Sequence, residues 1–184
     1  ASRDPNPKVN GKGIHILKGA GLTVHLGDGE EERLQVAEGY MKLMSTGLPF
    51  VIAKFAMSLD GKIALSSGES KWITSRESRD YVGLMRSQVG AVVAGIGTVL
   101  EDNPRLTARD FEGNAFPTQP LKLIVDSNAR TPLDAALLDG GGEVGVATCG
   151  AAALREQAVV NRGVSPITTD PKGANVALPD IISH

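Results

Sequence analysis

The sequence predicts an α/β fold built on a mainly parallel sheet flanked by helices. Short apolar runs that suit buried strands alternate with stretches whose apolar residues recur at helical spacing. Glycine and proline, with 22 and 10 residues, separate these stretches. Alternating strands and helices are typical of parallel sheets, because a crossover helix must return the chain to the start of the next strand.

The N-terminal elements are expected to be mainly helical. Residues 8–20 predict a short helix that Gly21 ends, and residues 22–26, LTVHL, predict a short strand. A second helix is expected to begin at the acidic residues 30–32, which suit the positive end of a helix dipole, and to stop at Gly47.

A buried strand and a capped helix are expected next. Residues 49–58, PFVIAKFAMS, form an apolar run that predicts the strand. Asp60-Gly61 predicts a tight turn, since glycine adopts positive φ easily. Thr74 and Glu77 have the spacing of a capping box, so a helix is predicted to begin at Thr74.

The remaining elements follow from short apolar runs. Strands are predicted at residues 90–94, 121–125 and 144–148, and a helix over 151–160. Residues 102–120 are rich in turn formers and are expected to form a long loop.

Composition and charge exclude several classes of protein. The net charge of −2 and a pI near 5.9 argue against a surface for nucleic acid or anionic membranes. No apolar run approaches the roughly 18 residues of a membrane span. A lone Cys149 and three scattered histidines predict neither a disulfide framework nor a zinc site. We therefore expect a cytoplasmic protein that binds no metal.

The stretch GAVVAGIGTVLEDNP, residues 90–104, is the first candidate site. A strand that runs through Gly-x-Gly-Thr into a helix turns backbone N–H groups outward, and Thr98 adds a hydroxyl that could bind a phosphate. A tight strand-to-helix turn that needs glycine explains the same pattern, and the pattern alone leaves both interpretations open.

Several charged residues have both structural and functional interpretations. Lys54, inside an apolar run, suits a sheet edge, a side chain that reaches out to water, or a polar pocket. Arg86 suits the C-terminal end of a helix, and Arg105 and Arg109 suit a solvated loop. Asp102 is consistent with a helix end.

The only tryptophan, Trp72, lies in the polar stretch SSGESKWIT, residues 66–74. An aromatic side chain there either fills the core beneath the loop or offers a flat surface to a ligand. The local pattern does not distinguish these two roles.

Three blocks in order carry a specific resemblance: KFAMSLDGKIALSSGESKWITS, LMRSQVGAVVAGIGTVLEDNPRLTARD and LKLIVDSNARTP. Together they resemble the reductase domain of the bifunctional deaminase/reductase of riboflavin biosynthesis. The start, DPNPKVNGKGI, resembles the end of the same protein's deaminase half. The resemblance implies that residues 1–47 are a remnant of a deaminase domain and that residues 48–184 are a reductase domain lacking its C-terminal part.

The resemblance implies a dihydrofolate-reductase-like fold, a homodimer, and reduction by NADPH of the ribose of 5-amino-6-(5-phosphoribosylamino)uracil. The positions it implies for NADPH are Ala56, Trp72, Thr98, Asp102 and Ser127. Those it implies for the substrate are Lys54, Ser70, Thr74, Arg86, Leu106 and Arg109. Lys54 and Asp102 are the implied catalytic residues. Two arginines suit a phosphate monoester, because a guanidinium binds phosphate oxygens in a bidentate way.

Departures from the family pattern leave alternatives open. The zinc signature of a deaminase is missing, so no deamination is expected. The acidic residue and glycine-rich loop of the family's C-terminal part cannot be identified, which suggests an incomplete fragment. A non-catalytic oligomerisation module, or a related enzyme of this fold with another substrate, would also be compatible.

Overall fold

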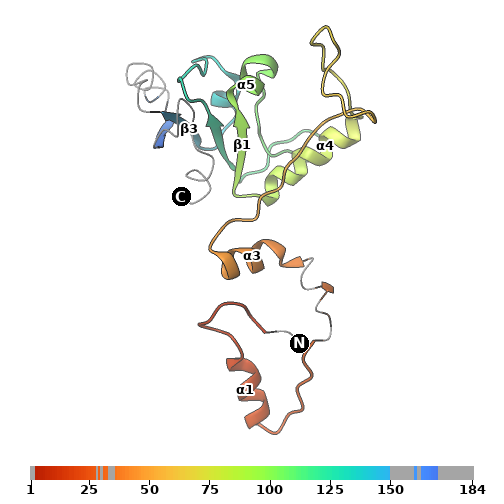
Figure 1. The fold of residues 1–184 in the computed structure, drawn as a ribbon, viewed down its shortest axis with the longest axis vertical. Helices are drawn as coiled ribbons and strands as arrows, with labels where there is room; N and C mark the ends of the chain where they lie inside the picture. Colours follow the sequence, from red (N-terminus) through yellow and green to blue (C-terminus); the bar gives the residue numbers. More distant parts are fainter. Residues whose placement is uncertain are drawn as a thin grey trace. The chain divides into compact units, whose positions relative to one another are not determined.

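The computed structural model describes residues 3–27, 29, 31–32, 36–149, 160 and 163–169 (Figure 1). Contacts divide the chain into two units, of which the first ends at Lys54 and the second begins at Phe55. This division lies C-terminal to the predicted boundary between residues 47 and 48. The origin of residues 1–47 as a deaminase remnant stays a prediction.

The first unit contains the helices α1 (Lys12–Gly19) and α3 (Glu38–Thr46). Gly47, with φ of 73°, ends α3 in the left-handed conformation and donates its N–H to the carbonyl of Leu43. The predicted end of this helix is therefore confirmed.

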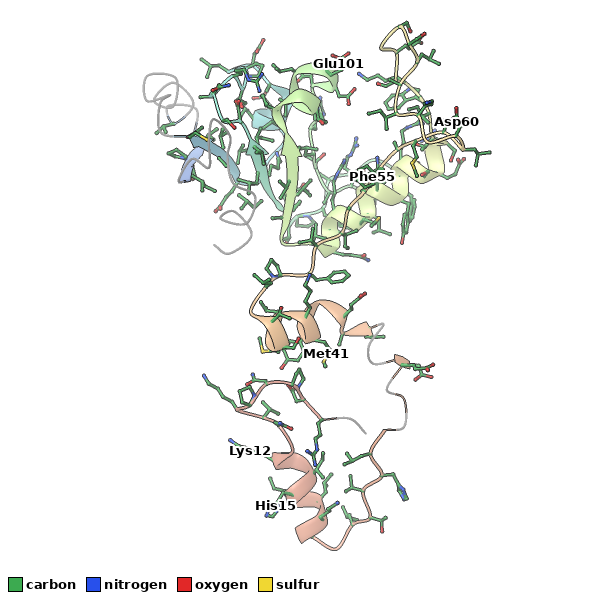
Figure 2. The ribbon with its side chains drawn as sticks, in the orientation of Figure 1. Lys12, His15, Met41, Phe55, Asp60 and Glu101 are labelled. Atoms are coloured by element: carbon green, nitrogen blue, oxygen red, sulfur yellow. The ribbon has the colours of Figure 1, made fainter. Side chains whose placement is uncertain are left out.

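Two predicted strands are wrong. Residues 22–26 and 49–58 are irregular and largely exposed. Figure 2 shows Phe55 on the second of these segments, which is drawn without a strand arrow. A strand is held by hydrogen bonds to a neighbouring strand, and within the described part of the chain neither segment pairs with one. The predicted turn that follows is confirmed, since Gly61 has φ of 78° and donates its N–H to the carbonyl of Ser58.

The second unit contains a parallel four-stranded sheet in the order β1-β2-β3-β4. Its strands are β1 (Ala91–Gly95), β2 (Leu121–Val125), β3 (Val144–Cys149) and β4 (Ser165–Thr169). The first three were predicted to within a residue or so, which confirms the α/β class. The strand β4 was not predicted, because its proline and polar residues give it no apolar run.

The core surrounds the two central strands. Ile124 of β2 and Val146 of β3 pack on one face of the sheet with Val99 and Leu137. Leu123, Ala147 and Cys149 pack on the other face. Burial on both faces explains why these strands are mainly apolar without alternation, and the buried Lys122 of β2 is satisfied by the carbonyl of Leu137.

Four helical segments complete the second unit: α4 (Arg76–Met85), the 3₁₀ segment η1 (Arg86–Gln88), α5 (Ile96–Asp102) and α6 (Ala136–Asp139). The N-cap of α4 is Ser75, whose Oγ accepts the N–H of Ser78 at 3.2 Å, so the predicted cap at Thr74 is wrong by one residue. The carbonyl of Thr74 instead accepts a hydrogen bond from the side chain of Arg79. The predicted helix over 151–160 lies outside the described residues, apart from Val160.

The predicted loop over 102–120 is irregular, as expected, but it is partly buried. Leu106, Thr107 and Ala108 are at most 7% exposed. Gln119 holds this segment, since its amide side chain bonds both the N–H and the carbonyl of Ala108. Among the described helices, none is long and apolar enough to cross a membrane.

Candidate functional site

The carboxyl ends of β1 and β2 bring two predicted cofactor residues to one edge of the sheet. Gly95 at the end of β1 pairs with Val125 at the end of β2. Thr98 follows in α5, which Figure 1 shows continuing directly from β1, and Ser127 follows β2. The carboxyl edge of a parallel sheet is the usual place for a ligand.

The N-terminal turn of α5 leaves room for a ligand to approach. No atom other than those of the chain neighbours and of the helix backbone lies within 4 Å of a Cβ placed on Gly95 or Gly97, and the side chain of Thr98 is exposed. The glycines therefore leave the backbone open to solvent here, which is consistent with the predicted cofactor role.

Asp102, at the other end of α5, connects this edge to the loop that carries Trp72. The Nζ of Lys71 lies 3.9 Å from the Oδ1 of Asp102. The structure thus brings two predicted cofactor positions, Trp72 and Asp102, into the same region.

Trp72 is 70% exposed, which contradicts a role in filling the core. The guanidinium carbon of Arg79 lies 4.2 Å from the centroid of its ring. One face of the indole is therefore covered by a cation, and the exposed remainder is available to a ligand.

Arg86 reaches from the end of α4 to the buried segment around Leu106. Its Nη1 donates to the carbonyl of Thr107 at 3.3 Å. The residue is half-buried, so it is not simply a solvated arginine at the C-terminal end of a helix. Leu106 itself is buried and has φ of 55°, an unfavourable left-handed conformation for leucine.

Arg109 is held beside α4 by its own backbone. Its N–H donates to the carbonyl of Gly83 at 3.1 Å, and the residue forms an antiparallel bridge with Ala115. Its side chain is exposed. The side chain of Arg109 is therefore solvated, as one of the two predicted interpretations had it, whereas its backbone is held by the hydrogen bond to Gly83 and the bridge to Ala115.

The two arginines influence each other electrostatically. Burial lowers the pKa of Arg86, and the positive charge of Arg109 lowers it further. Both arginines are anchored at the same short segment, Arg86 through the carbonyl of Thr107 and Arg109 through the carbonyl of Gly83, and an anion bound near them would relieve their repulsion. The arrangement suits a phosphate group.

Four predicted residues lie before α4 in the sequence. Lys54, at the end of the first unit, is exposed and is not part of a strand. Its ammonium group therefore needs no buried partner. Ala56, Ser70 and Thr74 are half-buried on irregular chain. Within the described residues, no hydrogen bond or ion pair joins Ala56 or Ser70 to the other predicted positions. Their roles stay predictions.

Sequence reasoning missed three residues that shape the site: Gly83, Arg79 and Gln119. Each acts through a contact with a residue in another element or turn of the chain, which no local pattern reveals. Within the described part of the chain, no group of three or more His, Cys, Asp or Glu side chains is placed to hold a metal ion.

A family model described as the RibD C-terminal domain matches residues 49–181. The riboflavin biosynthesis protein RibD of Chlamydia pneumoniae is 41% identical over 136 residues, which are 74% of this chain and 36% of that protein. The chain therefore spans little more than a third of the length of this relative.

Two solved structures are similar over almost the whole chain. RibD of Acinetobacter baumannii (form 1) matches with a TM-score of 0.79 and 37% identity, over 98% of this chain and 48% of that one. A diaminohydroxyphosphoribosylaminopyrimidine deaminase/5-amino-6-(5-phosphoribosylamino)uracil reductase of Thermotoga maritima matches with a TM-score of 0.80 and 34% identity, over 99% of this chain and 48% of that one. The predicted dihydrofolate-reductase-like α/β class is confirmed.

Proposed function

The chain belongs to the RibD C-terminal domain family, and we propose that it is the reductase of riboflavin biosynthesis, which reduces the ribose of 5-amino-6-(5-phosphoribosylamino)uracil with NADPH. The observation that carries the proposal is the anchoring of two arginines at one short segment: the Nη1 of Arg86 donates to the carbonyl of Thr107, and the N–H of Arg109 donates to the carbonyl of Gly83. A substrate without a phosphate would give no reason to hold two arginines together.

The donor set on the second unit fits a nicotinamide cofactor. Trp72 offers an exposed aromatic surface, Thr98 offers a hydroxyl beside an open helix start, and Ser127 follows the adjacent strand. Bound NADPH would supply the hydride that reduces C1 of the opened ribose.

The residues of this chain would bind and orient the reactants. Arg86 and Arg109 would hold the phosphate at one end of the substrate, and Ser70 and Thr74 would bond its polar groups. Lys54 would face the ribose, and Asp102 would act beside the cofactor. Fixing both reactants in one geometry contributes much of the rate enhancement in hydride transfer.

The test is an assay of NADPH oxidation with the deaminated, phosphorylated substrate. Arg86→Ala should raise the KM for that substrate about 30-fold or more, because it removes a partly buried cation from an anion. The KM for NADPH should barely change. Arg105→Ala is the control, since Arg105 is an exposed arginine in the irregular segment that also carries Arg109.

The alternatives give different results in the same assay. A chain that neither binds nor oxidises NADPH would be a non-catalytic module. Turnover of a substrate without phosphate, unaffected by Arg86→Ala, would identify a related enzyme of another specificity. Equal losses for both ligands in Arg86→Ala would contradict the assignment of Arg86. From the resemblance alone, we also propose a cytoplasmic homodimer.

A further inference from the structure

Arg79 of α4 lies against the only tryptophan of the chain. Its guanidinium carbon is 4.2 Å from the centroid of the Trp72 ring. A planar guanidinium at this distance is attracted by the π-electrons of the indole and covers one of its faces. The ring nevertheless remains 70% exposed, so much of its surface is still available.

A second contact fixes the guanidinium independently of the indole. The Nη1 of Arg79 donates to the carbonyl of Thr74 at 2.6 Å, two residues after Trp72. The backbone of Arg79 belongs to α4, and its N–H donates to the carbonyl of Ser75, the N-cap. Arg79 therefore joins a rigid helix to the loop that carries the tryptophan.

The other attachment of this loop is weaker. The Lys71–Asp102 pair has an N–O distance of 3.9 Å, and its side chains are 53% and 40% exposed. An exposed ion pair of this length contributes little to holding a loop, because water screens it. Of the two attachments, Arg79 is the one able to set the orientation of the ring.

We propose that Arg79 is a positioning residue for the cofactor: it stacks on one face of Trp72 and holds the opposite face toward the nicotinamide nucleotide. This inference rests on the proposed function, since NADPH is taken as the ligand of Trp72. A Trp72 ring that is already held in one orientation binds a flat ligand more tightly than a ring that rotates freely, because the ring loses less rotational freedom on binding.

The single tryptophan makes the proposal measurable without turnover. All emission above the tyrosine background comes from Trp72. Arg79→Gln removes the positive charge and the planar guanidinium that covers the indole, and its shorter side chain ends where the arginine Nε lies. Arg79→Lys keeps the positive charge without the planar group. Arg76→Gln is the matched control, because Arg76 lies on the same helix, is 75% exposed and pairs with Asp80.

Three quantities are to be measured on the full chain: acrylamide quenching of Trp72, the Kd for NADPH from quenching of the same emission, and the KM for each ligand. Arg79→Gln should increase acrylamide quenching and raise the Kd and KM for NADPH about fivefold, the loss expected for one cation–π contact. The KM for the phosphorylated substrate should change much less. Arg79→Lys should recover part of the affinity, and Arg76→Gln should match the unmodified chain.

Three results would overturn the proposal. The first is unchanged acrylamide quenching in Arg79→Gln, and the second is altered quenching with an unaltered Kd for NADPH. The third is an equal effect of Arg76→Gln, which would indicate a general effect of helix charge. Failure of the proposed function would instead appear in the unmodified chain, as a lack of NADPH binding, and the inference would fail with it.

Discussion

The backbone of Arg109, in the irregular segment after α5, is in direct contact with the backbone of Gly83 in α4. The N–H of Arg109 donates to the carbonyl of Gly83 at 3.1 Å, and a Cβ placed on Gly83 would lie 3.0 Å from the carbonyl oxygen of Arg109. Glycine lets the irregular segment approach α4 this closely without displacement. The contact fixes the backbone of Arg109 against α4, the helix that Arg86 follows.

Gly83→Ala should therefore weaken substrate binding. The added methyl group pushes the backbone of Arg109 away by a few tenths of an ångström, and we expect the KM for the phosphorylated substrate to rise about three- to tenfold. The KM for NADPH should not change. The higher helix propensity of alanine, about 1 kcal/mol, should offset the strain, so that thermal unfolding shifts little.

Gly90→Ala is the matched control for this substitution. A Cβ on Gly90 meets no atom within 4 Å beyond its chain neighbours, and the residue does not have a positive φ. It should leave both KM values unchanged. A Gly83→Ala variant with an unchanged substrate KM would contradict the positional role of Gly83.

Asn103 is expected to stabilise two helices at once. Its backbone, with φ of 44°, ends α5, and its Oδ1 accepts the N–H of Ala136 at the start of α6 at 2.8 Å. Asn103→Gly keeps the left-handed backbone but loses the hydrogen-bond acceptor, which costs about 1 kcal/mol. Asn103→Ala loses the acceptor and also strains the backbone, by about 1 kcal/mol more.

Chemical denaturation of the three variants tests this order. Asn103→Asp keeps an acceptor and should remain close to the unmodified chain in free energy of unfolding. Asn103→Gly should be less stable and Asn103→Ala the least stable. If the glycine and alanine variants are equally stable, the left-handed backbone contributes nothing.

Asp110 should make stability depend on pH in the acidic range. The side chain of Asn114 donates to Asp110, and the N–H groups of Asn114 and Glu112 donate as well, so the pKa of Asp110 lies below its ordinary 3.8. The unfolded chain binds the proton more readily, so the contribution is fully present above pH 3.8 and is lost as pH falls through the folded pKa.

Thermal unfolding of Asp110→Asn between about pH 2.5 and pH 6 measures this contribution. The unmodified chain should be the more stable at the upper end, and the difference should shrink toward the lower end. A difference that grows as pH falls would contradict the assignment.

Lys122 should make the stability of the folded chain depend on pH in the alkaline range. The side chain is 0% exposed and its Nζ donates to the carbonyl of Leu137 at 2.7 Å. Burial lowers the pKa of Lys122 below its ordinary 10.5. The unfolded chain then binds the proton more tightly, so stability should rise with pH between the folded pKa and 10.5.

Comparison with Lys122→Met isolates this effect. The free energy of unfolding of the unmodified chain should increase relative to that of the variant as pH approaches 10.5. A constant difference across the alkaline range would show that the ammonium is solvated in the folded protein.

The α/β class, the positions of β1, β2 and β3, and the end of α3 at Gly47 were predictable from the sequence. These features depend on local patterns: apolar runs, and a glycine that adopts positive φ. The blocks around Trp72 and Arg86 also carried a resemblance specific enough to predict the family. Local sequence patterns could not predict which segments pair as strands. Residues 49–58 have the composition of a strand but are not paired with another strand in the described structure.

The way the candidate site is built depends on tertiary contacts. The contact of Arg109 with Gly83 and the stacking of Arg79 on Trp72 join different segments of the chain, and no local pattern encodes such contacts. Leu106 is buried although its segment has the composition of a solvated loop. A contact within the folded segment allows this burial, because the side-chain amide of Gln119 bonds both the N–H and the carbonyl of Ala108. Local sequence sets which conformations are available, and packing between distant segments selects among them.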